Sequence, residues 1–110
     1  MVVAELKIVP IGTGDTSLSR YVAAIQRYLE ANASARGVTY ELTSMSTILD
    51  GDRDTITALA YGAADYLFDQ FPMEVHRLSI DLHVDDRRDK PGSSAQKLRS
   101  VRERLQSNGA

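Results

Sequence analysis

The sequence of 110 residues predicts an α+β fold, with four antiparallel strands in one sheet, two helices on one face of it and an extra helix at the C-terminal end. Four segments alternate apolar and polar residues, which is typical of strands with one buried face. Three segments space their apolar residues three and four positions apart, which is typical of amphipathic helices. These segments follow one another as strand, helix, strand, strand, helix, strand and helix.

Composition narrows the class of protein. The chain has 43% hydrophobic and 25% charged residues, which predicts a single globular domain over residues 1–110. A net charge of -2 argues against nucleic acid as a partner, and no apolar run is long enough for a membrane span. The chain has zero cysteines, so disulfides and thiolate chemistry are excluded. It opens on a strand-like pattern rather than a secretory signal, so we expect a cytoplasmic protein.

The first predicted strand leads into a glycine-rich loop. One strand face is apolar and the other carries Glu5 and Lys7, since side chains alternate sides. Pro10 cannot donate to a sheet ladder, so the strand should end there. The loop I-G-T-G-D-T-S at Ile11–Ser17 resembles a phosphate cradle before a helix but lacks the lysine of a P-loop. Both a structural turn and a weak phosphate site remain open.

The middle of the chain predicts a helix, a hairpin and a second helix. Thr16 or Ser17 can cap the first helix, whose apolar stripe is Leu18, Val22, Ile25 and Leu29. Strands at Val38–Thr43 and Ser46–Asp50 are so close in sequence that they must pair antiparallel. Asp52 can cap the second helix, and Pro72 stops it.

The last part of the chain predicts a strand at about Glu74–Val84, a charged loop at Asp85–Gly92 and a third helix. Ser93 and Gln96 form a capping-box pattern at the start of that helix. Its inner side should carry Leu98, Val101 and Leu105, and the tail beyond should be frayed. The full order is that of a ferredoxin-like βαββαβ sandwich with an extra C-terminal helix.

Helices cover only one face of such a sheet, and the open face is polar. It should carry Glu5, Lys7, Val9, Thr39, Glu41, Thr43, Ser79, Asp81 and His83, with Arg77 and Asp85 at the rim. One interpretation is a face in contact with water. The other is a subunit interface around a polar pocket, in which carboxylates would favour a cationic or amine-bearing ligand.

The two histidines support a catalytic or metal-binding interpretation only weakly. His83 shares the open face with Asp81, whereas His76 should lie on the core side near the start of the last strand. Two histidines without close spacing are usually structural, and no nucleophile motif is present. The charged run D-D-R-R-D at Asp85–Asp89 can pair with itself in solvent.

Three stretches together resemble the small thiamine-binding (YkoF-like) protein family, which long went without an assigned function. They are V-A-E-L-K-I-V-P-I-G-T-G-D-T-S-L-S-R-Y-V at Val3–Val22, Y-E-L-T-S-M-S-T-I-L-D-G at Tyr40–Gly51 and D-L-H-V-D-D-R-R-D-K at Asp81–Lys90. The resemblance implies a ferredoxin-like fold in a homotetramer, with sheets stacked face to face. It also implies non-covalent binding of thiamine or its pyrimidine near the interfaces, with no catalysis and no cofactor beyond the bound ligand.

On this resemblance, the expected ligand-binding residues are Glu5, Ser17, Glu41, Met45, Thr47 and Asp85. Carboxylates suit the thiazolium charge, hydroxyls suit the aminopyrimidine, and Met45 suits a ring. The sequence departs from relatives at Ala64 and Asp65, at Ser46 and at Phe71–Met73, which bears on the identity of the ligand. Two alternatives stay open: a cofactor-free monooxygenase or isomerase using His83 and Asp81, and a purely structural or regulatory oligomer.

Overall fold

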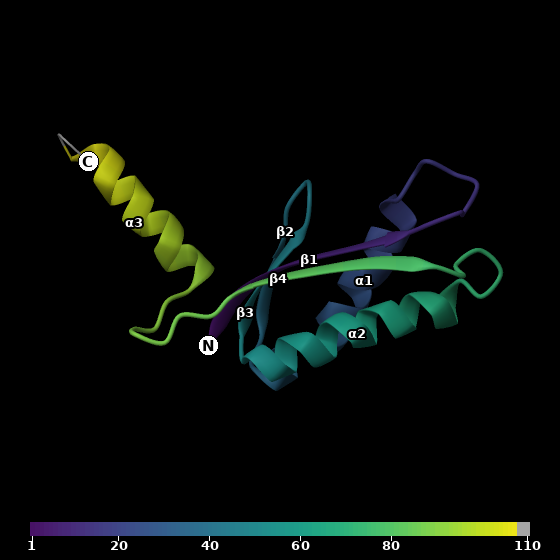
Figure 1. Ribbon diagram of the computed structural model, residues 1–110, viewed down its shortest axis with the longest axis horizontal. Helices are drawn as coiled ribbons and strands as arrows, with labels where there is room; N and C mark the ends of the chain where they lie inside the picture. The colour runs from purple at the N-terminus through teal and green to yellow at the C-terminus, as the bar shows by residue number, and fades with distance from the viewer. Residues whose placement is uncertain (108–110) are drawn as a thin grey trace.

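The computed structural model describes residues 1–107 and confirms the predicted order of elements (Figure 1). The strands are β1 (Val2–Pro10), β2 (Thr39–Leu42), β3 (Thr47–Gly51) and β4 (Leu78–Asp85). The helices are α1 (Ser19–Asn32), α2 (Arg53–Gln70) and α3 (Ser94–Gln106), and a 3₁₀ turn spans Ser34–Arg36. Within the described residues, no helix is long and apolar enough to cross a membrane.

The four strands form one antiparallel sheet in the order β2-β3-β1-β4, which is the ferredoxin-like arrangement. The register places Glu5 of β1 between Ile48 of β3 and His83 of β4, and Glu41 of β2 opposite Ile48. A single row of open-face residues therefore crosses the whole sheet. The next row joins Asp50, Val3 and Asp85 in the same way.

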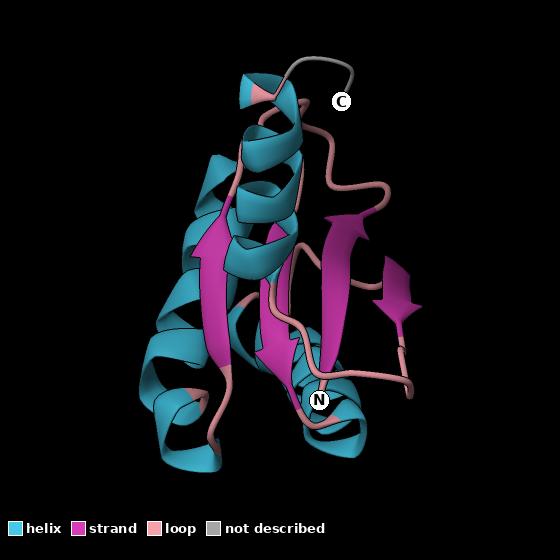
Figure 2. Cartoon of the chain, turned by 90° about the vertical axis from the view of Figure 1, so that its left-hand side faces the viewer, coloured by secondary structure: helices cyan, strands magenta, loops and turns pink. Residues whose placement is uncertain are grey.

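The core lies between the sheet and the layer made by α1 and α2 (Figures 1 and 2). The inward residues of β1 are buried as alternation predicts, and both helices bury their apolar stripes. Tyr21 is fully buried and meets Phe71 edge to face, with ring centroids 4.9 Å apart. Gly62 lets the two helices approach, because a Cβ there would lie 1.9 Å from the Tyr28 hydroxyl. The conformational cost of this mid-helix glycine is thus offset by close packing.

Helix caps follow the sequence at α2 and α3 but not at α1. The side chain of Asp52 accepts a hydrogen bond from the Thr55 N–H at 3.0 Å, and Ser93 accepts one from the Gln96 N–H at 3.2 Å. The predicted cap of α1 at Thr16 or Ser17 is wrong: α1 starts after Leu18, which makes no side-chain cap. Asp15 instead accepts a bond from the Ser17 N–H, so the loop closes on itself before the helix begins.

The last strand is shorter than predicted. β4 begins at Leu78 rather than near Glu74, because the chain turns after α2 and the Val75 N–H donates to the Phe71 carbonyl at 2.9 Å. His76 consequently lies exposed in this turn and not on the core side. Thr43 likewise lies in the hairpin turn rather than on β2.

The predicted inner side of the third helix is also wrong. Leu98, Val101 and Leu105 are 51%, 55% and 78% exposed, and α3 buries none of its residues. Figures 1 and 2 show why: α3 stands off the open face of the sheet and projects past its end. The chain measures 55 × 28 × 19 Å, with a radius of gyration of 16.0 Å against about 13 Å for a compact chain of this length. Residues 108–110 of the expected frayed tail lie outside the described residues.

Candidate functional site

A cavity of about 230 Å³ opens between α1 and the β2–β3 hairpin, and we call it the hairpin cavity. Its apolar lining comes from β1 and α1, through Leu6, Ile8, Leu18, Val22 and Ile25. Its polar lining comes from Lys7, from Gln26 and from the hairpin turn at residues 43–47. An apolar chamber with a few polar groups is the usual form of a small-molecule site, and this volume suits one substituted ring better than a larger ligand.

The hairpin turn is held in one shape by Thr43. Its N–H donates to the Ser46 carbonyl at 2.8 Å, and its hydroxyl accepts from the N–H groups of Met45 and Ser46 at 3.3 and 3.1 Å. The turn therefore fixes where its residues face. Met45 is 77% exposed at the mouth of the cavity, while Ser46 is buried at its wall.

Gln26 and Thr47 supply the polar end of the hairpin cavity. The Gln26 amide N–H donates to the Thr47 hydroxyl at 2.9 Å. Within residues 1–107, no other side-chain hydrogen bond engages the second N–H or the carbonyl oxygen of Gln26, or the hydroxyl proton of Thr47. A side-chain amide with one free N–H and a free carbonyl oxygen pairs well with a heteroaromatic ring that has an amino group beside a ring nitrogen, as glutamine pairs with adenine.

Glu5 connects the hairpin cavity to the open face of the sheet. Its carboxylate accepts a hydrogen bond from the Ser46 hydroxyl at 2.8 Å, and Ser46 lines the cavity. On its other side, Glu5 borders a shallow open-face groove with Ile48 and His83. Negative charge is thus placed one hydrogen bond from the wall of the cavity.

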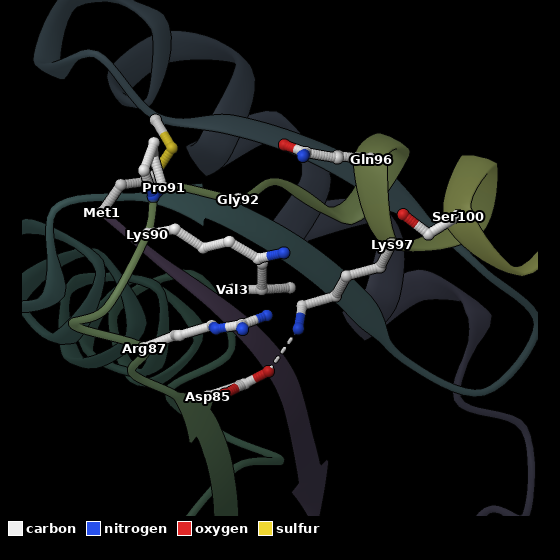
Figure 3. Close-up of a pocket in the computed structure, with 10 residues that line it drawn as sticks. All are labelled: Met1, Val3, Asp85, Arg87, Lys90, Pro91, Gly92, Gln96, Lys97 and Ser100. Atoms are coloured by element: carbon white, nitrogen blue, oxygen red, sulfur yellow. Dashed lines mark hydrogen bonds and ion pairs between the residues drawn. The ribbon is translucent and has the colours of Figure 1, made fainter.

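Asp85 lies at the opposite end of β1, in a small cleft between β1, the β4–α3 loop and α3 (Figure 3). It accepts a bond from the Lys97 ammonium at 2.5 Å. Beside it, the Arg87 guanidinium holds the Asp89 carboxylate through two bonds of 2.5 and 2.9 Å. These bonds lower the pKa of Asp89 to about 2. The self-paired interpretation of the charged run is confirmed for this pair and for Arg88 with Asp86.

The six residues expected to bind ligand fall into three groups. Met45 and Thr47 line the hairpin cavity, and Glu5 reaches its wall through Ser46. Glu41 and Asp85 belong to the open face and its far end. Ser17 is exposed in the loop before α1 and borders none of these hollows.

Sequence analysis missed Gln26 as a candidate site residue. The signal was present, because Gln26 follows Ile25 directly and borders the apolar stripe of α1. A polar residue at the edge of a helix stripe is common, however, and only the fold brings it to Thr47, 21 positions away.

The fold does not arrange His83 and Asp81 as a catalytic pair, and it does not assemble a metal site within the described residues. His83 and Asp81 are exposed on the open face, and neither side chain makes a hydrogen bond within residues 1–107. In the same residues, no group of three or more histidine, aspartate or glutamate side chains is placed to hold a metal ion.

The fold and the hairpin cavity define a small ferredoxin-like α+β domain with a ring-sized chamber beside its hairpin. A model of the family described as "Thiamine-binding protein" matches residues 4–102. The chain therefore belongs to the thiamine-binding protein family.

Its relatives cover nearly the full chain. It is 34% identical over 106 residues to the UPF0045 protein YqgV of Bacillus subtilis, spanning 96% of this chain and 99% of that one. The crystal structure of hypothetical protein MJ1052 of Methanocaldococcus jannaschii is 31% identical, with a TM-score of 0.75 over 93% of this chain and 96% of that one. A candidate thiamine biosynthesis/salvage protein of Thermotoga maritima shares the fold at 22% identity, with a TM-score of 0.64 over 91% and 97% of the two chains.

Proposed function

We propose that this protein binds thiamine or a related hydroxymethylpyrimidine without transforming it, and so serves its storage, sensing or delivery. The observation that carries the proposal is the amide of Gln26 beside the Thr47 hydroxyl at the polar end of an apolar, ring-sized cavity. An aminopyrimidine offers one donor and one acceptor side by side, and the amide offers the complement. Membership of the thiamine-binding family supports the same ligand.

The remainder of the ligand would leave the hairpin cavity at its mouth. Met45 is exposed there and provides a polarizable contact for a second ring. A thiazolium carries a permanent positive charge, and the carboxylate of Glu5 lies behind Ser46 on the cavity wall. Attraction between the thiazolium and Glu5 would favour thiamine over the free pyrimidine, whereas the positive charge of Lys7, which also borders the cavity, would oppose it.

The binding unit we propose is a homotetramer whose interfaces cover the open face and α3. The open face is acidic, because Glu5, Glu41, Asp50, Asp81 and Asp85 outnumber Lys7 and Arg77 there. α3 is basic, because Lys97, Arg99, Arg102 and Arg104 outnumber Glu103. α3 also exposes its apolar stripe. A helix with apolar and basic residues is complementary to an acidic sheet face of a second copy, and closed symmetric assembly would bury both.

A blocked cavity tests the site. Val22 lines the hairpin cavity and is half-buried, so Val22→Phe would place a ring in the ligand's space. Ala23→Phe makes the same kind of change on the exposed side of α1 and serves as the control. Thermal-shift and calorimetric titrations would use thiamine, its phosphates and the free aminomethylpyrimidine.

The wild-type protein and Ala23→Phe should show a saturable rise in melting temperature with one of these compounds, since a ligand bound only by the folded state must stabilise it. Val22→Phe should lose that rise while melting no lower than the control. Binding that survives unchanged in Val22→Phe would remove the hairpin cavity from the proposal. The absence of a shift with every one of these compounds would refute the proposed ligand.

A further inference from the structure

The small cleft that contains Asp85 is lined by three cationic side chains. Arg87, Lys90 and Lys97 border a volume of about 70 Å³ above Val3. Figure 3 shows the Lys90 ammonium and the Arg87 guanidinium reaching toward Val3 from one side and Lys97 from the other. Three positive groups from the β4–α3 loop and from α3 thus converge on one hollow.

Many donors in this cleft have no partner. Lys90 forms no ion pair within residues 1–107. Asp89 occupies two nitrogens of Arg87 and leaves the third, and Asp85 occupies one of the three Lys97 donors. The side chains of Gln96 and Ser100 also border the cleft. Asp85 is the single carboxylate among the described lining residues, so positive charge exceeds negative.

We propose that this cleft binds a phosphate group. A tetrahedral oxyanion presents several acceptor oxygens, which matches a set of ammonium, guanidinium, amide and hydroxyl donors converging from several sides. The volume admits a group of that size and excludes a ring or a nucleotide as a whole.

The phosphate site is separate from the proposed thiamine site. Val3 at the cleft and Leu6 at the hairpin cavity are three residues apart on β1, about 10 Å along an extended strand. Val3 is on the open face and Leu6 is on the core face, so the sheet lies between the cleft and the ligand of the hairpin cavity in the same subunit. A negative result for one of the two sites therefore does not refute the proposal for the other.

The cleft opens into the shallow groove on the open face of the sheet. The open-face groove that contains Glu5 and His83 shares Val3, Asp85 and Lys97 with it. The organic part of a phosphate monoester would extend into this groove and face the Glu5 carboxylate. A monoester with an amine, such as phosphoethanolamine, should therefore bind more tightly than glycerol phosphate, whereas free phosphate uses the cleft alone.

The test is a titration of the full-length protein with inorganic phosphate, glycerol phosphate and phosphoethanolamine at constant ionic strength. Binding is monitored by phosphorus NMR. Lys90→Gln removes the unpaired cation, and Arg99→Gln removes one positive charge from an exposed position of α3 outside the cleft. Asp85→Asn removes the carboxylate that occupies Lys97.

Phosphate affinity should fall about tenfold in Lys90→Gln, stay unchanged in Arg99→Gln and rise in Asp85→Asn. Opposite signs for Lys90→Gln and Asp85→Asn, together with an unchanged affinity in Arg99→Gln, would establish a site with this geometry. No saturable binding of any of the three compounds by the wild-type protein would overturn the proposal. Equal losses in Lys90→Gln and Arg99→Gln would overturn it as well, because they would show only a general charge effect.

Discussion

The exposed stripe of α3 gives the sharpest prediction about assembly. Val101 is in the middle of that stripe and is 55% exposed, with Leu98 and Leu105 on either side. Full burial of a valine side chain stabilises by about 1.5 to 3 kcal/mol, so covering the exposed half in an interface contributes about 1 kcal/mol. Val101→Glu would lose this contribution and would place a carboxylate in an apolar contact, at a cost of about 3 kcal/mol.

The sum is about 4 kcal/mol for each buried helix, or about a thousandfold in the dissociation constant. Folding of the single chain should be affected little, because α3 buries none of its residues. Sedimentation velocity across a dilution series would measure association, and circular dichroism would verify the fold. Tyr61→Glu is the control, since Tyr61 is 58% exposed on α2. If Val101→Glu and wild type assemble equally at micromolar concentration, the reasoning about α3 is refuted.

Three further predictions concern single contacts. Gly62→Ala should lower the free energy of unfolding by about 1 to 3 kcal/mol despite the better helix propensity of alanine, because its Cβ meets the Tyr28 hydroxyl; a higher melting temperature would contradict this. The carboxyl of Asp89 has a lowered pKa of about 2, so the pair with Arg87 stabilises the fold above the ordinary pKa near 4 and is lost as pH falls toward 2. Arg87→Gln should return the pKa of Asp89 toward its ordinary value, and an NMR titration would measure this change. Glu41 borders the open face and not the hairpin cavity, so Glu41→Gln should leave both the fold and thiamine affinity unchanged, and a weakened calorimetric affinity would move the site to the open face.

Sequence patterns were sufficient for the sheet and its core because those contacts are periodic. Alternation in β1 assigns Glu5 and Lys7 to the open face whatever else the chain does. The tight connection between β2 and β3 fixes their pairing, and Asp52 marks the start of α2 in any context. Each of these features depends on residues close together in the chain.

α3 could not be placed from its sequence, because an apolar stripe has the same spacing whether its partner is the same chain or another one. Leu98 and Val101 satisfy that pattern and yet face solvent in the single chain. The hairpin cavity could not be predicted from the sequence for a related reason. Gln26 and Thr47 come from elements that meet only after the sheet has formed, and nothing in either segment alone specifies the other.

The attachment of α3 has a consequence for how the chain folds. Its bonds to the rest of the chain are in the first turn, from the Ser94 N–H to Asp50 and from Lys97 to Asp85. The other turns have no core contact, and an isolated helix of this length is marginal in water. In the proposed tetramer, helix formation there would be coupled to mass action. At high dilution α3 should melt well before the sheet, and the helical signal of this protein should rise with its concentration.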